Sequence, residues 1–237
     1  MGLRTEFLEN AWYAAALSKE VERGKMFSRK LLGSKVLMYR DSSGKAVAMR
    51  YRCPHRFVPL SGGTLDEQDN IVCPYHGLKF NGDGQCVHNP HGQGQIPPNA
   101  KVETYPLLEK YGFLWIWMGE EEADPSQLGD WSELDNGPDT GVAHTYMKLD
   151  CNYELIIDNV MDLSHVDHVH SEIISTRGKL SPMVPRPKIE NDTVTTNWEW
   201  EQQPAMLIFN QFLPDHEAEA RHYFQITWSA PANIQLS

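Results

Sequence analysis

The sequence predicts an α+β protein built from two domains, and three observations predict this class. The first half consists of short apolar runs separated by turn residues, as in an antiparallel β domain. The segment 120–140 is acidic and contains two prolines, which indicates a linker or a surface crossing. Beyond it, apolar residues first follow near-helical spacing and then return to strand-like runs. We therefore expect domains at residues 1–121 and 122–237.

Composition and charge exclude several classes of protein. The 237 residues are 41% hydrophobic and 22% charged, which is ordinary for a globular chain. A formal net charge of −11 argues against nucleic acid or an anionic membrane as the main partner. The early apolar run 11–17 is too short to span a bilayer. Four cysteines are too few for a disulfide scaffold, so we expect a cytoplasmic protein with reduced thiols and no membrane partner.

Turn signals define the strands of the first domain. The runs 35–40 and 45–51 flank Asp-Ser-Ser-Gly at 41–44, which predicts a hairpin. The stretch 89–100 is rich in Gly and Pro and predicts a loop. Further strands are predicted at 70–74, 77–80, 85–90 and 112–119.

The second domain begins with a helical pattern. Apolar side chains at positions 155, 156, 160, 163 and 166 predict a helix within 152–170. Four strand-like runs follow, and several of them alternate apolar and polar residues. These runs are 193–200, 205–212, 221–230 and 233–237.

The stretch from Cys53 to His76 carries four metal-ligating side chains in the pattern C-x-H, seventeen residues, C-x2-H. One zinc ion accepts such a set, but zinc fingers usually pair Cys with Cys and His with His. Here each loop offers one of each, through Cys53 and His55 and through Cys73 and His76. This mixture suits a [2Fe–2S] cluster of the Rieske type, in which one iron takes both thiolates and the other both imidazoles.

The residues around these ligands support two tight loops. Prolines stiffen both loops, and Gly62, Gly63 and Gly77 would let the backbone approach the sulfur atoms. Tyr75 either donates a hydrogen bond to the cluster or packs as an ordinary aromatic residue. The remaining Cys and His residues of this region fit no ligand position, and we expect structural roles for Cys86, His88, His91 and Cys151.

The predicted helix 152–170 contains a second set of possible ligands. Non-heme Fe(II) is commonly held by two histidines and one carboxylate. The run 158–170 offers acidic residues and three histidines. On a regular helix His165 and His168 share a face, whereas His165 and His170 lie about 140° apart. Spacing alone therefore selects His168 as the partner of His165.

At CPHRFVPLSGG, CPYHGLKF and DNVMDLSHVDHVH, the sequence resembles the Rieske non-heme iron oxygenases. NAWYAAAL and KYGFLWIWMG also resemble the branch of vanillate demethylase and dicamba monooxygenase. The resemblance implies a helix-grip (START-like) catalytic domain after the Rieske domain. It implies cluster ligation by the four residues above. It also implies a mononuclear Fe(II) on His165 and His170, with the helix distorted or ended between them.

The resemblance also implies roles for two neighbouring polar residues. Asp162, three residues before His165, has a carboxylate placed to hold the other ring nitrogen of that ligand. In the family the matching Asp also links to a cluster histidine of the neighbouring subunit, here His76, which implies a head-to-tail ring and a homotrimer. Asn159 matches a polar position beside the iron, or is an ordinary helix-surface residue.

The expected activity is that of a monooxygenase or demethylase component. The resemblance implies O2 as co-substrate and electrons from NAD(P)H through a separate reductase or ferredoxin. The substrate would be a small aromatic acid that is hydroxylated or O-demethylated with loss of formaldehyde. Residues that either line a substrate pocket or belong to the general core are Phe209, Phe212 and Phe224.

The chain departs from the family pattern at its end. The third iron ligand of the family is a carboxylate beyond these strands, and no residue matches it. Three carboxylates lie nearby in an expected exposed loop, but we assign none of them as the third ligand. They are Asp215, Glu217 and Glu219. We therefore expect a catalytic domain that is incomplete at its C-terminus. Two alternatives remain: a Rieske electron-transfer protein without oxygenation chemistry, and a zinc-binding structural module.

Overall fold

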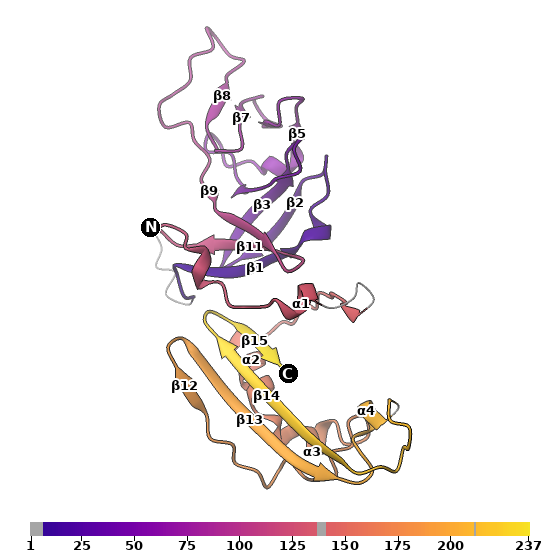
Figure 1. Ribbon diagram of the computed structural model, residues 1–237. Coiled ribbons are helices and arrows are strands. Elements are labelled where there is room, and N and C mark those ends of the chain that lie inside the picture. Colours follow the sequence, from indigo (N-terminus) through magenta and orange to yellow (C-terminus); the bar gives the residue numbers. More distant parts are fainter. Residues whose placement is uncertain (1–6, 137–140, 211) are drawn as a thin grey trace. The chain divides into compact units, whose positions relative to one another are not determined.

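The computed structural model of the chain describes residues 7–136, 141–210 and 212–237 (Figure 1). Its contacts divide the chain into two compact units, Met1–Thr145 and Tyr146–Ser237. This division falls later than the expected one at 121/122, because Leu128 is buried in a cluster with Trp12 and Trp117 of the first unit. Residues 137–140 of the expected linker lie outside the described residues. The α+β class with antiparallel sheets is confirmed.

Three antiparallel sheets form the described part of the first unit. The predicted hairpin is confirmed, with Arg40 paired to Ala46 on either side of the turn. One sheet has the order β1-β11-β10, another β2-β3-β4-β9, and the third β5-β6-β7-β8. Their bounds are β1 Ala11–Leu17, β2 Phe27–Leu31, β3 Ser34–Arg40, β4 Ala46–Arg50, β5 Thr64–Leu65, β6 Ile71–Val72, β7 Lys79–Phe80, β8 Cys86–His88, β9 Thr104–Tyr105, β10 Leu107–Lys110 and β11 Phe113–Met118.

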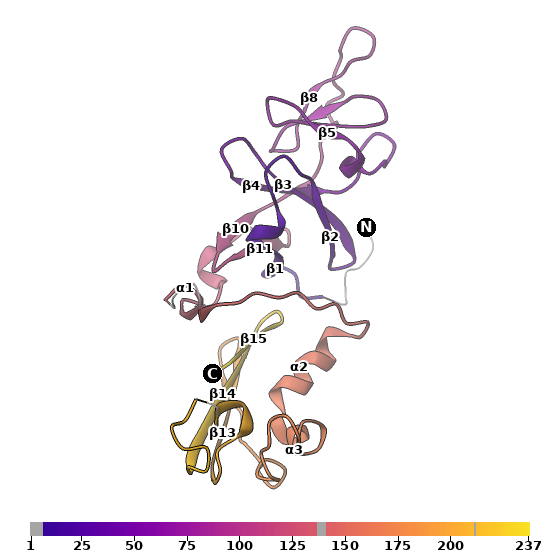
Figure 2. The same cartoon turned by 90° about the vertical axis from the view of Figure 1, so that its right-hand side faces the viewer.

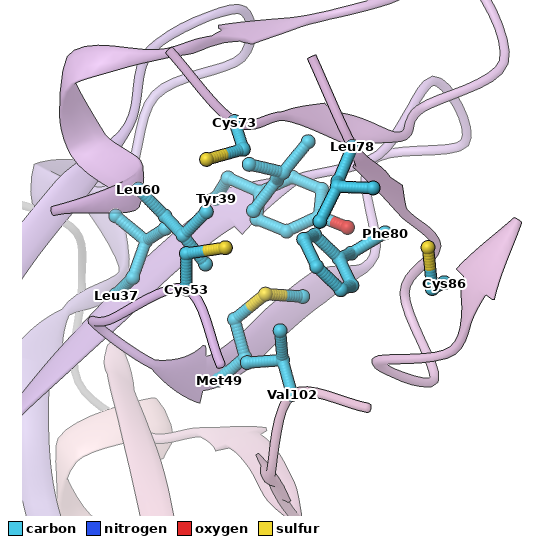
Figure 3. Close-up of a cluster of buried hydrophobic side chains, with 11 residues drawn as sticks. Leu37, Tyr39, Met49, Cys53, Leu60, Cys73, Leu78, Phe80, Cys86 and Val102 are labelled. Carbon is cyan, nitrogen blue, oxygen red and sulfur yellow. The ribbon is translucent and has the colours of Figure 1, made fainter. Parts of the chain in front are cut away.

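A hydrophobic cluster lies beneath the loops that carry the predicted cluster ligands (Figure 3). Leu37, Tyr39 and Phe80 are fully buried in it. Cys53 and Cys73 belong to the same cluster, so the two loops are anchored by their cysteines. Burying this apolar surface contributes about 25 cal/mol per Å² and fixes the loops on the sheet.

The second unit contains the sheet β12-β13-β14-β15 and short helices. Along β13, burial alternates so that Trp198 and Trp200 are buried while Glu199 and Glu201 are exposed. Figure 2 shows α2 and α3 beside one face of this sheet, where Val166 packs with the two tryptophans. The bounds are α1 Glu133–Asn136 in the first unit, then α2 Tyr153–Met161, α3 Val166–Val169, β12 Lys188–Glu190, β13 Thr193–Gln202, α4 Leu207–Asn210, β14 Ala220–Ser229 and β15 Asn233–Leu236.

The strand expected at 205–212 is wrong. Leu207–Asn210 forms the short helix α4, in which the N–H groups of Phe209 and Asn210 donate to the carbonyl of Met206. Short apolar runs do not distinguish strand from helix, and this run lacks the alternation seen in β13. No helix in the described part of the chain combines the length and the apolar character needed to cross a membrane.

Candidate metal centres

The two cysteine loops share one backbone design. In both, the cysteine N–H donates to the carbonyl five residues later, at 3.0 Å in the first loop and 2.8 Å in the second. The cysteine carbonyl accepts from the residue four positions later, which is Phe57 for Cys53 and Gly77 for Cys73. That fourth residue has a positive φ in each loop, 56° for Phe57 and 69° for Gly77. The fold thus presents two cysteines from two equivalent turns.

The two thiols form a buried pair. Cys53 and Cys73 are 1% and 2% exposed, and their side chains lie within hydrogen-bonding reach of each other. Figure 3 shows both in one part of the hydrophobic cluster, with Cys86 on its other side. Burial raises the pKa of the Cys53 thiol, and the neighbouring Cys73 thiol raises it further. A bound cation reverses this effect because it stabilises the thiolate.

The two imidazoles form a second, more exposed pair. The rings of His55 and His76 lie 4.7 Å apart between centroids, and His55 is exposed. Burial lowers the pKa of His76, and positive charge on nearby His55, His91 and Arg56 lowers it further. A lowered pKa keeps the ring neutral, which is the form that binds metals.

This donor set fits a Rieske cluster. The structure pairs thiol with thiol and imidazole with imidazole, as two irons with different ligands require, whereas a tetrahedral zinc site needs all four donors at one point. Among the described residues, no three Cys, His, Asp or Glu side chains lie close enough together to hold a single metal ion. Tyr75 is 62% exposed and packs its ring 3.9 Å from that of His76, in line with the packing alternative.

Glycine is required near the cluster for a reason that differs from the expected one. A Cβ on Gly63 would lie 1.9 Å from the carbonyl oxygen of Val72, the residue before Cys73. The close approach is therefore to the backbone of the second loop rather than to sulfur. Gly62 has no such constraint, because its Cβ would meet Pro74 at 3.7 Å.

In the second unit, the structure brings together the histidines that the resemblance selects. The rings of His165 and His170 lie 5.4 Å apart between centroids. His168 turns elsewhere, and its Nε2 lies 3.1 Å from the Ser181 hydroxyl. The predicted helix stops at Asp162, whose φ of −114° and ψ of 102° are extended, and resumes through a 3₁₀ turn into α3. Both histidines lie after this break, and α3 ends at Val169, so His170 with φ −118° and ψ 18° leaves the regular helical path. The helix therefore ends between the two histidines, as the resemblance implies; their role as iron ligands stays a prediction.

A backbone hydrogen bond fixes the tautomer of His165. Its Nδ1 lies 2.6 Å from the carbonyl oxygen of Asp162, which can only accept, so Nδ1 carries the proton. The unprotonated Nε2 accepts a long hydrogen bond of 3.5 Å from the side-chain amide of Asn159, which a bound metal would replace. This is the arrangement that a ligating histidine needs.

The hydrogen bond expected from Nδ1–H of His165 to the Asp162 carboxylate is wrong, because that N–H donates to the backbone carbonyl of the same residue. The extended backbone at the helix break places the carbonyl of Asp162 beside the ring. The carboxylate instead accepts from the N–H of Ser164 at 2.9 Å and caps the next turn. Asp162 is exposed, which leaves its second oxygen accessible from outside the second unit.

Sequence reasoning missed Asp167, which holds the segment after His170. Its carboxylate accepts from the Thr176 hydroxyl and from the N–H of Ser181 at 2.6 Å. Although burial raises the pKa of Asp167, these hydrogen bonds outweigh it and lower the pKa. The sequence could have indicated this role, because Asp167 is an acidic residue between two histidines and is followed by possible hydrogen-bond donors at Thr176 and Ser181.

The structure shows where the three phenylalanines lie that could line a pocket or belong to the core. Phe224 packs in the core, with its ring stacked 5.6 Å from Trp200, whereas Phe212 is 76% exposed and Phe209 is 42% exposed. The carboxylates that were not assigned lie in an exposed loop as expected, at Asp215, Glu217 and Glu219.

Two family models match the chain. Residues 11–106 match the Rieske [2Fe-2S] domain, and residues 149–237 match the vanillate O-demethylase oxygenase C-terminal domain. These matches cover both candidate centres.

Individual proteins give the same result. The chain is 39% identical to the oxygenase component of chloroacetanilide N-alkylformylase from Rhizorhabdus wittichii, over 97% of this chain and 66% of that protein. It is 43% identical to the oxygenase component of dicamba O-demethylase from Stenotrophomonas maltophilia, over 69% of this chain and 48% of that protein. The chain thus spans less than two thirds of either relative.

The structure resembles that of dicamba monooxygenase bound to 3,6-dichlorosalicylic acid. The TM-score is 0.88 at 32% identity, covering 98% of this chain and 67% of the other. Another structure of that enzyme contains non-heme iron and dicamba.

Proposed function

The chain belongs to the Rieske oxygenase family, and from that premise we propose that it acts as the terminal oxygenase component of a monooxygenase or demethylase system. The observation that carries the proposal is the meeting of His165 and His170 at a helix break, with the Nδ1 of His165 already occupied. A Rieske cluster by itself serves electron transfer, whereas a second iron site adds a place for oxygen chemistry.

Each pair of side chains has a distinct task in this proposal. Cys53 and Cys73 would hold one iron of the cluster, and His55 and His76 would hold the other. His165 and His170 would hold Fe(II). When bound, the two centres supply single electrons and a site for O2 activation.

The polar residues beside His165 keep it in a ligating form. The Asp162 carbonyl keeps the proton on Nδ1, and Asn159 faces Nε2. The third, carboxylate ligand is not assigned to any residue of this chain.

The proposed electron path runs between copies of the chain. The Asp162 carboxylate is exposed in the second unit, and the imidazole pair lies toward the surface of the first. A hydrogen bond from the ring N–H of His76 in one copy to the Asp162 carboxylate of a neighbouring copy would connect the two centres in a homotrimeric ring. Electrons would enter from NAD(P)H through a separate reductase or ferredoxin.

The proposed substrate is a small aromatic acid that is hydroxylated or O-demethylated. The support is the similarity to dicamba O-demethylase and to the vanillate O-demethylase C-terminal domain. The alternative of an electron-transfer protein without oxygenation leaves the His165–His170 pair without a role, so we do not favour it.

The test combines metal analysis with a substrate screen. The purified protein should contain two acid-labile sulfides and up to three irons per chain, with a Rieske-type EPR signal. Methoxylated and chlorinated benzoates, supplied with a reductase and NAD(P)H, should give formaldehyde or hydroxylated acids. A preparation that contains zinc and no sulfide would overturn the proposal.

A further inference from the structure

The loop 89–100, here called the NPH loop after its first residues, lies against the second cysteine loop. The ring of Pro90 packs closely against Gly77: a Cβ at this glycine would lie only 3.2 Å from Cγ of Pro90. At the next residue, Nε2 of His91 lies 2.8 Å from the backbone carbonyl oxygen of His76. Two consecutive residues of the NPH loop thus contact two consecutive residues of the ligand loop.

The NPH loop holds His91 in place through its own hydrogen bonds. The N–H of His91 donates to the side-chain oxygen of Asn89 at 3.1 Å, and its carbonyl accepts from Gly94 at 3.0 Å. The Asn89 amide in turn donates to the carbonyl of Gln95 at 2.6 Å. Because the His76 carbonyl can only accept, Nε2 of His91 must carry a proton.

His76 needs such a restraint because one side of it borders open space. A cavity of about 490 Å³ is lined by both cluster histidines, His91 and parts of the NPH loop. The ring of His91 meets that of His76 edge to face, at 5.9 Å and 76°. Side chains that border a cavity have fewer packing contacts to fix their orientation. The backbone hydrogen bond therefore supplies a restraint that packing does not.

We propose that His91 is a positioning residue for the cluster ligand His76, acting through the hydrogen bond from its Nε2–H to the His76 carbonyl. This inference rests on the proposed function, since it takes His76 to be a ligand. His91 does not bind iron in this proposal. It holds the backbone that presents the imidazole, as residues around a metal site commonly do for its ligands.

Two substitutions separate the hydrogen bond from the ring. His91→Leu removes the donor, whereas His91→Gln keeps an N–H at a similar distance from the backbone. His88→Leu is the matched control, because His88 is an exposed histidine of the same segment. The readouts are the rate of iron release to a chelator from the purified holoprotein and the g values of the reduced cluster.

We expect His91→Leu to release iron about five- to tenfold faster, as the loss of one hydrogen bond implies, and to shift the g values. His91→Gln and His88→Leu should stay within twofold of the parent protein. If His91→Leu accumulates without a cluster, the comparison moves to assembly, where His91→Gln must reach the parent's iron and sulfide content.

Two outcomes overturn the inference. In one, His91→Leu matches the parent protein in both readouts; in the other, His91→Gln fails as severely as His91→Leu. Failure of the proposed function is distinguishable, because it is judged on the parent protein before any substitution is made. A parent without acid-labile sulfide has no cluster, and a parent with sulfide that gives no product in the substrate screen has no oxygenase activity; neither result depends on His91.

Discussion

The contacts of their ring nitrogens distinguish His165 from His168. In His165 the proton is on Nδ1, which donates to the Asp162 carbonyl, and the unprotonated Nε2 has only a long contact of 3.5 Å with the Asn159 amide nitrogen. His168 has its Nε2 at the Ser181 hydroxyl instead. The difference is therefore local to each side chain, although the two residues lie only three positions apart.

His165→Ala should remove the mononuclear iron and leave the cluster intact. Because the one remaining imidazole holds Fe(II) far more weakly than the pair, we expect iron to fall by about one per chain. Product formation should fall by more than about a hundredfold, the upper end for residues that only orient a metal ligand. Inductively coupled plasma analysis and the Rieske EPR signal measure the two centres separately. His168→Ala is the control and should keep both the cluster and the mononuclear iron; equal loss of iron in the two variants would contradict the assignment.

Gly62 and Gly63 give a second matched pair. A methyl group at Gly63 meets the Val72 carbonyl at 1.9 Å, so Gly63→Ala must push the two cysteine loops apart. We expect a loss of about 1–3 kcal/mol in the free energy of unfolding, as in other overpacked sites, with less cluster per chain. Gly62→Ala should change stability by less than about 0.5 kcal/mol. Urea unfolding and the visible absorbance of the cluster test both, and equal behaviour of the two variants would show that the contact is unimportant.

The turn between β5 and β6 depends on one carboxylate. Oδ1 of Asp66 accepts from the N–H groups of Gln68 and Asn70, and Lys79 donates to Oδ2 at 2.8 Å. Although burial raises the pKa of Asp66, Lys79 and the hydrogen bonds from Asn70 and Gln68 outweigh it and lower the pKa well below its usual range. This turn leads directly into β6 and Cys73.

A folded-state pKa below the unfolded one has a defined consequence for stability. The Asp66 carboxylate stabilises the fold at every pH above its unfolded pKa of about 4. That stabilisation is lost as pH falls from there through the lower folded pKa. We expect Asp66→Asn to cost about 1–3 kcal/mol at neutral pH and to show a smaller loss of stability between pH 4 and 2. Unfolding measured across this range tests it; Glu67→Gln, at an exposed neighbour, should follow the parent curve.

The elements show where sequence patterns suffice and where they do not. The hairpin at 41–44 and the strand at 112–119 follow from turn chemistry and a continuous apolar run, and both are present. The helix 152–170 follows from its spacing, but its break at Asp162 does not, because no Pro or Gly marks it. The Asp162 carbonyl holds His165 only because of that break. Every residue has a backbone carbonyl, so a contact to one leaves no signal in the sequence. This holds for the contact of His165 with the Asp162 carbonyl and for that of His91 with the His76 carbonyl.

At the scale of the whole molecule, the proposed ring makes each active site depend on two copies of the chain. The exposed Asp162 carboxylate and the surface pair His55 and His76 belong to different compact units. If electrons cross from the cluster of one copy to the iron of the next, two different inactive variants should complement each other. If electrons instead pass between the two centres of the same chain, the two variants should not complement each other.

Co-expression of Cys53→Ser, which lacks the cluster, with His165→Ala, which lacks the second iron, tests this directly. In a randomly mixed ring, a site is active when a copy with an intact cluster precedes one with an intact iron site. With equal amounts of the two variants this holds for about one site in four, so activity should recover to about a quarter of the parent value. The variants purified separately and mixed without subunit exchange are the control. Differently tagged, co-purified rings that remain inactive would contradict electron transfer between copies, because both intact centres are then present in one assembly.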